Sequence, residues 1–269
     1  MSYSYEPEVR VHGGREPAPG NRSKPCLASA SLVLVFALLL ALSPARPAMA
    51  AAIENLPATY AGEIPCADCA AQRLVLTLFA DSTFRLRRTY VGAAGGGDAV
   101  YYDLGRWALA SAGDRLQLAG GTEASRQFLL VAPERIRMLD NEGREIRTQL
   151  NYDLVRQPDV DPVAGPMRLH GMYTYMADAA SFAECLTGQR YPVPIEGDHA
   201  AVERAYAQTR SEPGAPVLVT ITGRFVERAP EPGLPVRDHL VIEKLDRFWP
   251  GASCARGAGD AAIRPGFHP

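Results

Sequence analysis

Apolar and polar side chains alternate in one short segment after another once the first fifty residues are passed. Residues 74–78 carry leucine at every second position, which places these leucines on one face of an extended strand. In the next segment Phe84 and Leu86 take the inner face, so we expect Arg85 and Arg87 to point outward. Seven or eight short strands at even spacing, with no helical period between them, are typical of a small antiparallel, lipocalin-like β-barrel.

A segment rich in proline and aspartate, residues 158–166, separates the predicted barrel (56–157) from a second domain (167–256). The second domain contains β-branched strand segments and a predicted helix over 199–210, which Asp198 can cap. Strands around a single helix in a domain of this size predict an OB-type β-barrel. The fold class is therefore mainly β, with two small barrels and one helix.

An uncharged, apolar run covers residues 27–45. Arg22 and Lys24 precede the run, and an Ala-x-Ala site follows it at residues 48–50. A basic flank, a short apolar run and such a site are the parts of a secretory signal peptide. We expect residues 1–50 to be removed and the rest of the chain to act in the periplasm. An uncleaved segment that keeps the protein at the membrane is the alternative.

The charge balance argues against a nucleic-acid-binding protein. Twenty-eight basic and thirty acidic residues give a net charge of −2, which leaves no basic excess for phosphate contacts. A hydrophobic content of 47% is that of a globular protein and excludes a wholly disordered chain. Residues 257–269, rich in glycine and alanine, are expected to form a flexible tail.

Four cysteines follow the predicted cleavage site: Cys66, Cys69, Cys185 and Cys254. An even number of cysteines in an exported protein predicts disulfides, although the sequence alone leaves their connectivity open. A bridge between Cys185 and Cys254 would close a long loop and contribute about 4 kcal/mol to stability. Two unpaired, buried thiols are the alternative for this pair.

Cys66 and Cys69 form a CxxC motif, which suits three kinds of site. The two sulfurs can close a small disulfide, chelate a soft metal ion such as Cu(I) or Zn(II), or act as a catalytic dithiol. A thioredoxin-type redox role would need Cys66 at a helix N-terminus, where the helix dipole lowers the thiol pKa, whereas a predicted strand follows Cys69. A structural zinc site needs four ligands, and the remaining cysteines lie far away in sequence. The motif therefore favours a structural or redox-responsive disulfide, with a metal site as the second interpretation.

The chain contains no Gly-x-Ser-x-Gly, Walker or His-Glu-x-x-His motif, so we predict no catalytic residues and no enzyme. Met172 and Met176 share one face of a predicted strand, with Tyr173 and Tyr175 on the other. We expect these methionines to fill the core rather than to bind copper. The histidines are scattered and show no spacing typical of metal ligands.

Several short motifs occur in a fixed order between residues 56 and 254. In the first half they are YAGEIPCADC (60–69), FADSTF (79–84), RTYVG (88–92), GRW (105–107), MLD (138–140) and NYDL (151–154). In the second half they are LHGMYTYMADAA (169–180), CLTGQR (185–190), ERAY (203–206) and FWP (248–250). Together these motifs resemble the NlpE family, in an N-terminal CxxC domain followed by a C-terminal OB-type domain.

The resemblance implies an envelope lipoprotein associated with copper tolerance and with the signalling of surface contact and envelope stress to the Cpx sensor kinase. By resemblance, Cys66 and Cys69 match the family's CxxC, and Cys185 and Cys254 match its C-terminal disulfide. One feature departs from the family. A lipoprotein needs a cysteine directly after the apolar run, whereas residues 48–52 read AMAAA. We therefore expect a mature protein without a lipid anchor.

These observations favour a non-catalytic periplasmic sensor or adaptor, with a role in copper tolerance and envelope-stress signalling through redox-sensitive cysteine pairs. Its expected partners are an envelope-stress sensor kinase and a copper ion, and no other cofactor is predicted. Two alternatives remain open. One is a carrier of small ligands in the N-terminal barrel, because small barrels can hold one ligand. The other is a thiol–disulfide oxidoreductase that uses Cys66 and Cys69.

Overall fold

The computed structural model describes most of the chain, namely residues 53–110, 112–121, 125–229 and 235–254. The predicted signal peptide and the predicted flexible tail lie outside these ranges. The described part of the chain contains no helix that is long and apolar enough to cross a membrane.

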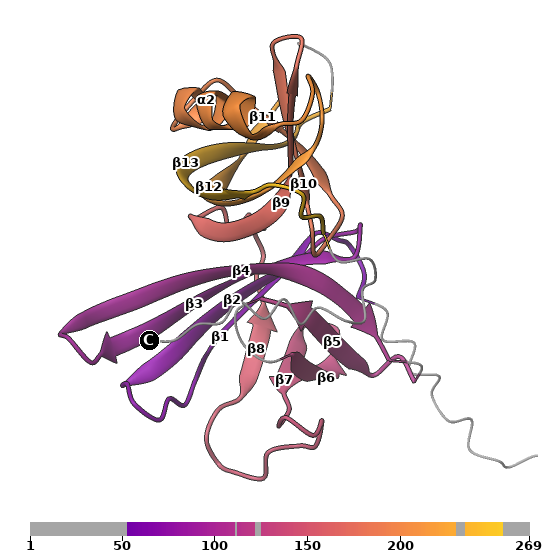
Figure 1. Ribbon diagram of the computed structural model, residues 1–269. Helices are drawn as coiled ribbons and strands as arrows, with labels where there is room; N and C mark the ends of the chain where they lie inside the picture. The colour runs from indigo at the N-terminus through magenta and orange to yellow at the C-terminus, as the bar shows by residue number, and fades with distance from the viewer. Residues whose placement is uncertain (1–52, 111, 122–124, 230–234, 255–269) are drawn as a thin grey trace, which may run out of the picture. The chain divides into compact units, whose positions relative to one another are not determined.

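The N-terminal domain is a closed barrel of eight strands, each antiparallel to its neighbours in chain order (Figure 1). The barrel closes where Tyr60 and Ala61 of the first strand pair with Arg156 and Val155 of the last. The prediction of a small antiparallel barrel is confirmed. The strands are β1 (Ala58–Ile64), β2 (Ala71–Leu78), β3 (Thr83–Ala93), β4 (Gly97–Leu109), β5 (Arg115–Gly120), β6 (Arg126–Ala132), β7 (Arg135–Met138) and β8 (Asp153–Arg156).

Side chains that alternate along the strands fill the interior of the barrel. Leu74, Leu76 and Leu78 of β2 are completely buried, as their spacing predicts. Phe84 and Leu86 of β3 are buried in the same core. Because full burial of one such side chain contributes about 1.5–3 kcal/mol, this core is a main source of the barrel's stability.

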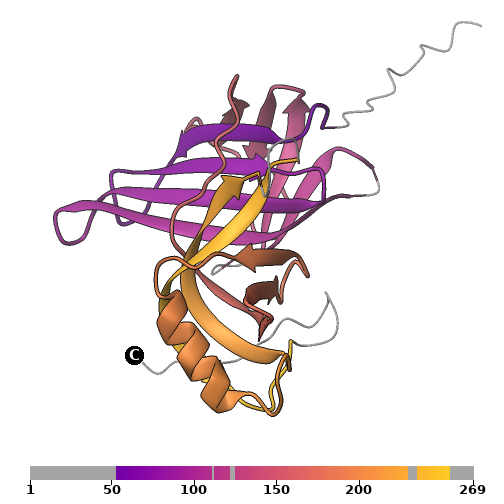
Figure 2. The same cartoon turned by 90° about the horizontal axis from the view of Figure 1, so that it is seen from above.

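The C-terminal domain is a five-stranded antiparallel sheet with one helix in its described part (Figure 2). Its elements are β9 (Met167–Met176), β10 (Ala179–Glu184), β11 (Arg190–Val193), α2 (His199–Thr209), β12 (Val217–Arg228) and β13 (Arg237–Trp249). The strand order is β11–β10–β9–β12–β13, and β11 also contacts β13, so the sheet curls toward closure as OB-type sheets do. Val202 and Tyr206 of α2 pack into the core of this domain. The mainly β fold class is therefore confirmed.

The prediction that Met172 and Met176 fill the core is wrong. Met172 is half-buried and Met176 is 62% exposed, whereas Tyr173 has no exposed surface. Tyr173 packs edge-on against Tyr206 and Phe248, with ring centroids 5.3 and 6.1 Å away. The aromatic face of β9 buries more apolar surface than the methionine face would, and it therefore faces the core.

Arg85 points away from the barrel interior, as predicted. It is not exposed to solvent, however, because only 3% of the residue remains accessible. Its guanidinium donates hydrogen bonds to the carbonyl of Pro162, at 3.1 Å, and to the carboxylate of Asp238. The same group lies 3.9 Å from the ring centroid of Phe225. Residues of the linker and of the C-terminal domain thus cover this part of the outer barrel surface, which the pattern of β3 alone does not reveal.

The segment after β8 follows the barrel surface through Asp161. Its backbone N–H donates a hydrogen bond to Thr59 Oγ1 at 2.9 Å, and its carbonyl accepts one from Thr77 Oγ1 at 2.6 Å. Its carboxylate accepts a hydrogen bond from Arg87 at 2.8 Å. These contacts hold the start of the predicted linker against the barrel.

Helix α2 begins after Asp198 as predicted, but the predicted capping role of the Asp198 side chain is wrong. The carboxylate makes no hydrogen bond within the first turn of the helix. Instead it accepts a hydrogen bond from the backbone N–H of Leu245 at 3.1 Å. Asp198 therefore joins the start of α2 to β13.

Candidate functional site: the two cysteine pairs

Cys66 and Cys69 are joined by a disulfide in the loop between β1 and β2. Their Cα atoms lie 5.3 Å apart, and both residues are half-buried. Directly after the motif, Ala70 donates a backbone hydrogen bond to Val91 at 2.9 Å, and β2 begins at Ala71. Since the motif leads into a sheet, no helix N-terminus is available to lower a thiol pKa. The surroundings do not favour a dithiol catalyst.

A metal site with several protein ligands has no counterpart among the described residues. No group of three or more His, Cys, Asp or Glu side chains in that part of the chain could hold a metal ion. After reduction, Cys66 and Cys69 would offer two soft thiolate ligands and no third one. Such a pair suits Cu(I) better than zinc, which takes four ligands in structural sites.

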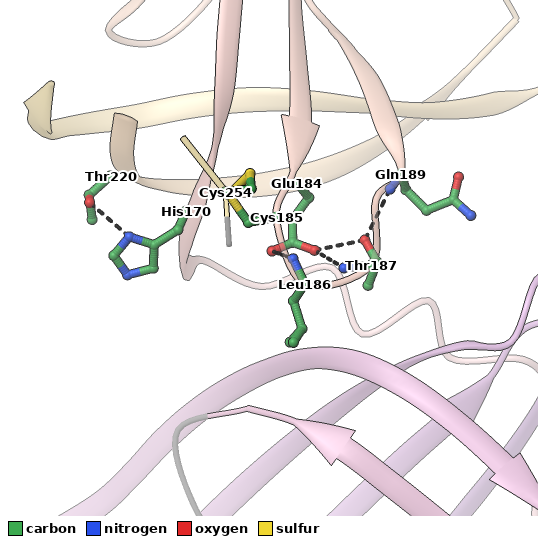
Figure 3. Close-up of a disulfide and its surroundings, with 8 residues drawn as sticks. All are labelled: His170, Glu184, Cys185, Leu186, Thr187, Gln189, Thr220 and Cys254. Carbon is green, nitrogen blue, oxygen red and sulfur yellow. Dashed lines mark hydrogen bonds between the residues drawn. A yellow bond between two sulfur atoms is a disulfide. The ribbon is translucent and has the colours of Figure 1, made fainter. Parts of the chain in front are cut away.

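Cys185 and Cys254 are joined by the second disulfide, across a sequence separation of 69 residues. Cys185 directly follows β10, and Cys254 follows the end of β13, so the bond ties these two ends together (Figure 3). Their Cα atoms lie 5.2 Å apart, and both residues are half-buried. The Cys185 N–H donates a hydrogen bond to the carbonyl of His170 at 2.9 Å, which extends the pairing of β9 and β10 to this residue.

The carboxylate of Glu184 shapes the turn that begins at Cys185 (Figure 3). Its Oε1 accepts a hydrogen bond from the Leu186 N–H at 3.0 Å. Its Oε2 accepts bonds from the N–H and the hydroxyl of Thr187, at 2.6 and 2.7 Å. Glu184 is only 5% exposed, so these bonds replace most of its contact with water. Sequence reasoning missed this residue, although the Glu-Cys-Leu-Thr order is compatible with such a local turn.

His170, Thr220 and Trp249 form a second polar group near the disulfide. Thr220 Oγ1 lies 2.9 Å from His170 Nδ1 and accepts a hydrogen bond of 2.9 Å from the indole N–H of Trp249. Burial lowers the pKa of His170, and the nearby positive charge of Arg168 lowers it further, so the imidazole is neutral near neutral pH. The group joins β9, β12 and β13 just before the chain reaches Cys254.

Two cavities of the barrel bear on the interpretation as a carrier of small ligands. A cavity near the end of the barrel, lined in part by Phe84, Leu86 and Leu118, measures about 10 Å³. That volume is close to the minimum for a single water molecule. A larger, open groove of about 350 Å³ runs past Arg126, Met138 and Asp140. The enclosed cavity is thus too small for a ligand larger than water, while the open groove has the volume of a small-molecule site, so the ligand-carrier interpretation stays a prediction.

Two family models match the two domains. The model described as the NlpE N-terminal domain matches residues 60–149, within the barrel. The model described as the NlpE C-terminal OB domain matches residues 163–255, which include the whole curled sheet. The cysteines of both disulfides lie inside these matched ranges.

The chain is also similar to individual proteins. The chain is 34% identical to lipoprotein NlpE of Escherichia coli (strain K12) over 210 residues, which cover 78% of this chain and 85% of that protein. The crystal structure of the Cpx pathway activator NlpE from Escherichia coli is 32% identical, with a TM-score of 0.33, and covers 74% of this chain and 99% of that one. A crystal structure of a putative lipoprotein from Shewanella oneidensis is 29% identical, with a TM-score of 0.34, and covers 39% of this chain and 92% of that one.

Proposed function

The chain belongs to the NlpE family, and we propose from this membership that it is a non-catalytic signalling protein of the cell envelope. The observation that carries the proposal is the 34% identity to Escherichia coli NlpE over 78% of this chain. That relative is described as the Cpx pathway activator. By the same role, this chain reports envelope stress to a sensor kinase of the Cpx type, which is its protein partner.

Overproduction in cells that carry a Cpx-type reporter tests this role. Reporter output should rise when the chain is overproduced, and the rise should disappear in cells that lack the sensor kinase. An unchanged output, or an equal rise without the kinase, would contradict the proposal.

The redox-sensitive element in this proposal is the bond between Cys185 and Cys254. Two features support it: both cysteines are half-buried rather than enclosed, and the bond joins the end of β10 to the segment after β13. Impaired oxidative folding would leave this pair reduced and would remove the stabilisation of a long cross-link. The loosened C-terminal domain would then signal to the sensor kinase that disulfide formation is impaired.

Copper binding, in this proposal, is confined to the reduced forms of Cys66 and Cys69, because a disulfide has no thiolate to offer. Titration of Cu(I) into the reduced protein should show binding that the double variant Cys66→Ser/Cys69→Ser loses. The matched control, Cys185→Ser/Cys254→Ser, should keep the affinity of the parent. Equal affinity in the parent and in the Cys66→Ser/Cys69→Ser variant would place the metal elsewhere.

The proposed location is the periplasm, where an oxidising environment maintains disulfides. The predicted signal peptide, residues 1–50, supports export. The intact mass of protein recovered from the periplasmic fraction should correspond to a chain that starts near Ala51. Recovery of the full-length chain in the membrane fraction would instead favour an uncleaved anchor.

A further inference from the structure

Residues 185–189 of the C-terminal domain form a turn that lies against the N-terminal barrel, the contact turn. The side chain of Leu186 packs onto Gly120 at the end of β5 so closely that a Cβ atom at Gly120 would overlap it. Gly120 also has a φ of +113°, which a residue with a side chain rarely adopts. Both features make this position of the barrel suited to glycine and to close contact with the turn.

Two hydrogen bonds join the same turn to the barrel. The guanidinium of Arg106, on β4, donates to the carbonyl of Thr187. The side-chain amide of Gln189 donates to the carboxylate of Asp81 at 3.0 Å. The contact turn therefore meets the barrel through both apolar and polar contacts.

The contact turn is also the segment that the disulfide holds. It begins with Cys185 itself, whose bond to Cys254 fixes the first residue of the turn. The carboxylate of Glu184 then fixes the backbone of Leu186 and Thr187. The disulfide and the barrel contact are thus both made by residues 185–189.

We propose that the Cys185–Cys254 bond and the barrel contact are thermodynamically coupled, so that reduction loosens the contact turn from the barrel. The proposal rests on the redox role proposed above and adds the route by which the N-terminal domain responds to it. A dithiol reductant supplies two electrons and two protons: its own sulfurs form a disulfide while Cys185 and Cys254 become two thiols. The released turn gains conformational freedom, and ordering it against the barrel then costs more free energy.

Coupling of this kind is reciprocal. If reduction lowers the equilibrium constant for forming the barrel contact by some factor, loss of the contact must raise the equilibrium constant for reduction by the same factor. The contact can be weakened from the barrel side, by Arg106→Ala, without touching the domain that holds the disulfide. Leu186→Ala weakens it from the turn itself.

The experiment measures the reduction equilibrium in a Cys66→Ser/Cys69→Ser background, so that one disulfide is titrated. The protein is equilibrated with defined ratios of reduced to oxidised dithiothreitol, its thiols are trapped, and the reduced fraction is measured by mass spectrometry. Arg106→Ala should raise the equilibrium constant for reduction about 2- to 10-fold, the range expected for one lost hydrogen bond. Leu186→Ala should shift it in the same direction.

Two control variants replace an arginine and a branched apolar residue by alanine at positions outside the barrel contact. Arg73→Ala removes an exposed barrel arginine that pairs with Glu63, and Ile195→Ala shortens an apolar side chain that is 76% exposed. Both should titrate like the parent. If Arg106→Ala and Leu186→Ala also titrate like the parent, the coupling is absent.

Hydrogen exchange tests the reciprocal direction. In Cys185→Ser/Cys254→Ser, backbone amides of residues 118–121 should exchange faster than in the oxidised parent, while those of β2 stay protected. Equal exchange at residues 118–121 would overturn the coupling. Arg106→Lys keeps the positive charge and a donor group, so it should disturb the contact less than Arg106→Ala does. Circular dichroism of each variant shows whether the fold is intact. Both measurements use purified protein, so the coupling and the signalling role in cells can fail independently.

Discussion

At the scale of single residues, the buried carboxylate of Glu184 determines the backbone conformation next to Cys185. It accepts three hydrogen bonds from Leu186 and Thr187, over distances of 2.6 to 3.0 Å. The alternation of β10 does not single out this glutamate, because a polar residue at the end of a strand is ordinarily exposed. Its role depends on the turn that follows, and the sequence pattern contains no direct sign of that turn's geometry.

Replacing Glu184 by alanine should destabilise the C-terminal domain by about 2–4 kcal/mol, because it leaves two backbone N–H groups and one hydroxyl without their acceptor. Glu184→Gln keeps one acceptor oxygen and should lose less. Urea unfolding measures the free energy of unfolding of each variant. The control Glu212→Ala, in the exposed loop after α2, should change it by less than about 0.5 kcal/mol. A Glu184→Ala variant as stable as this control would show that the carboxylate does not organise the turn.

At the scale of strands and helices, the sequence predicts an element well where only one of its faces is apolar. The leucines of β2 and the Phe84 face of β3 are buried as predicted. Strand β9 has apolar residues on both faces, Met172 on one and Tyr173 on the other, so the period of two cannot tell which face is buried. The helical period predicts α2, but it does not predict the hydrogen-bond partner of Asp198, because Leu245 lies on a strand distant in sequence.

Closure of the barrel offers a test at this scale. Strands β1 and β8 pair at only two positions, and a Cβ atom on Gly62 of β1 would overlap the backbone carbonyl of Asp153. Since backbone atoms cannot move aside without opening this seam, Gly62→Val should destabilise the barrel by about 1–3 kcal/mol. Thermal unfolding checks the shift. Gly97→Val, where no atom lies within 4 Å of the added Cβ, should shift the midpoint far less. Similar shifts for both would show that the seam tolerates a side chain.

At the scale of the whole described molecule, one hydrophobic cluster fills the barrel, and a second fills the C-terminal domain and also includes Leu104 of barrel strand β4. Contacts on the outer barrel surface join the two domains. The sequence predicts two domains and a connecting segment from composition and periodicity. It does not predict the contact between them, because Arg85 and its partner Asp238 are 153 residues apart. The cysteine pairs illustrate the same limit: an even count predicts bonding, but only the fold brings Cys185 and Cys254 together.

The central claim is that the bond between Cys185 and Cys254 controls the stability of the C-terminal domain selectively. Removing a cross-link over this separation forfeits about 4 kcal/mol, a large part of the stability of a typical domain. The most direct measurement is limited proteolysis during thermal unfolding of Cys185→Ser/Cys254→Ser, with Cys66→Ser/Cys69→Ser as the matched control. Residues 167–254 should melt earlier and be cut first, with residues 56–157 surviving as a folded core, and the control should behave like the parent. The claim would be contradicted if both domains unfolded together at a lower temperature than in the parent, or if neither domain was destabilised.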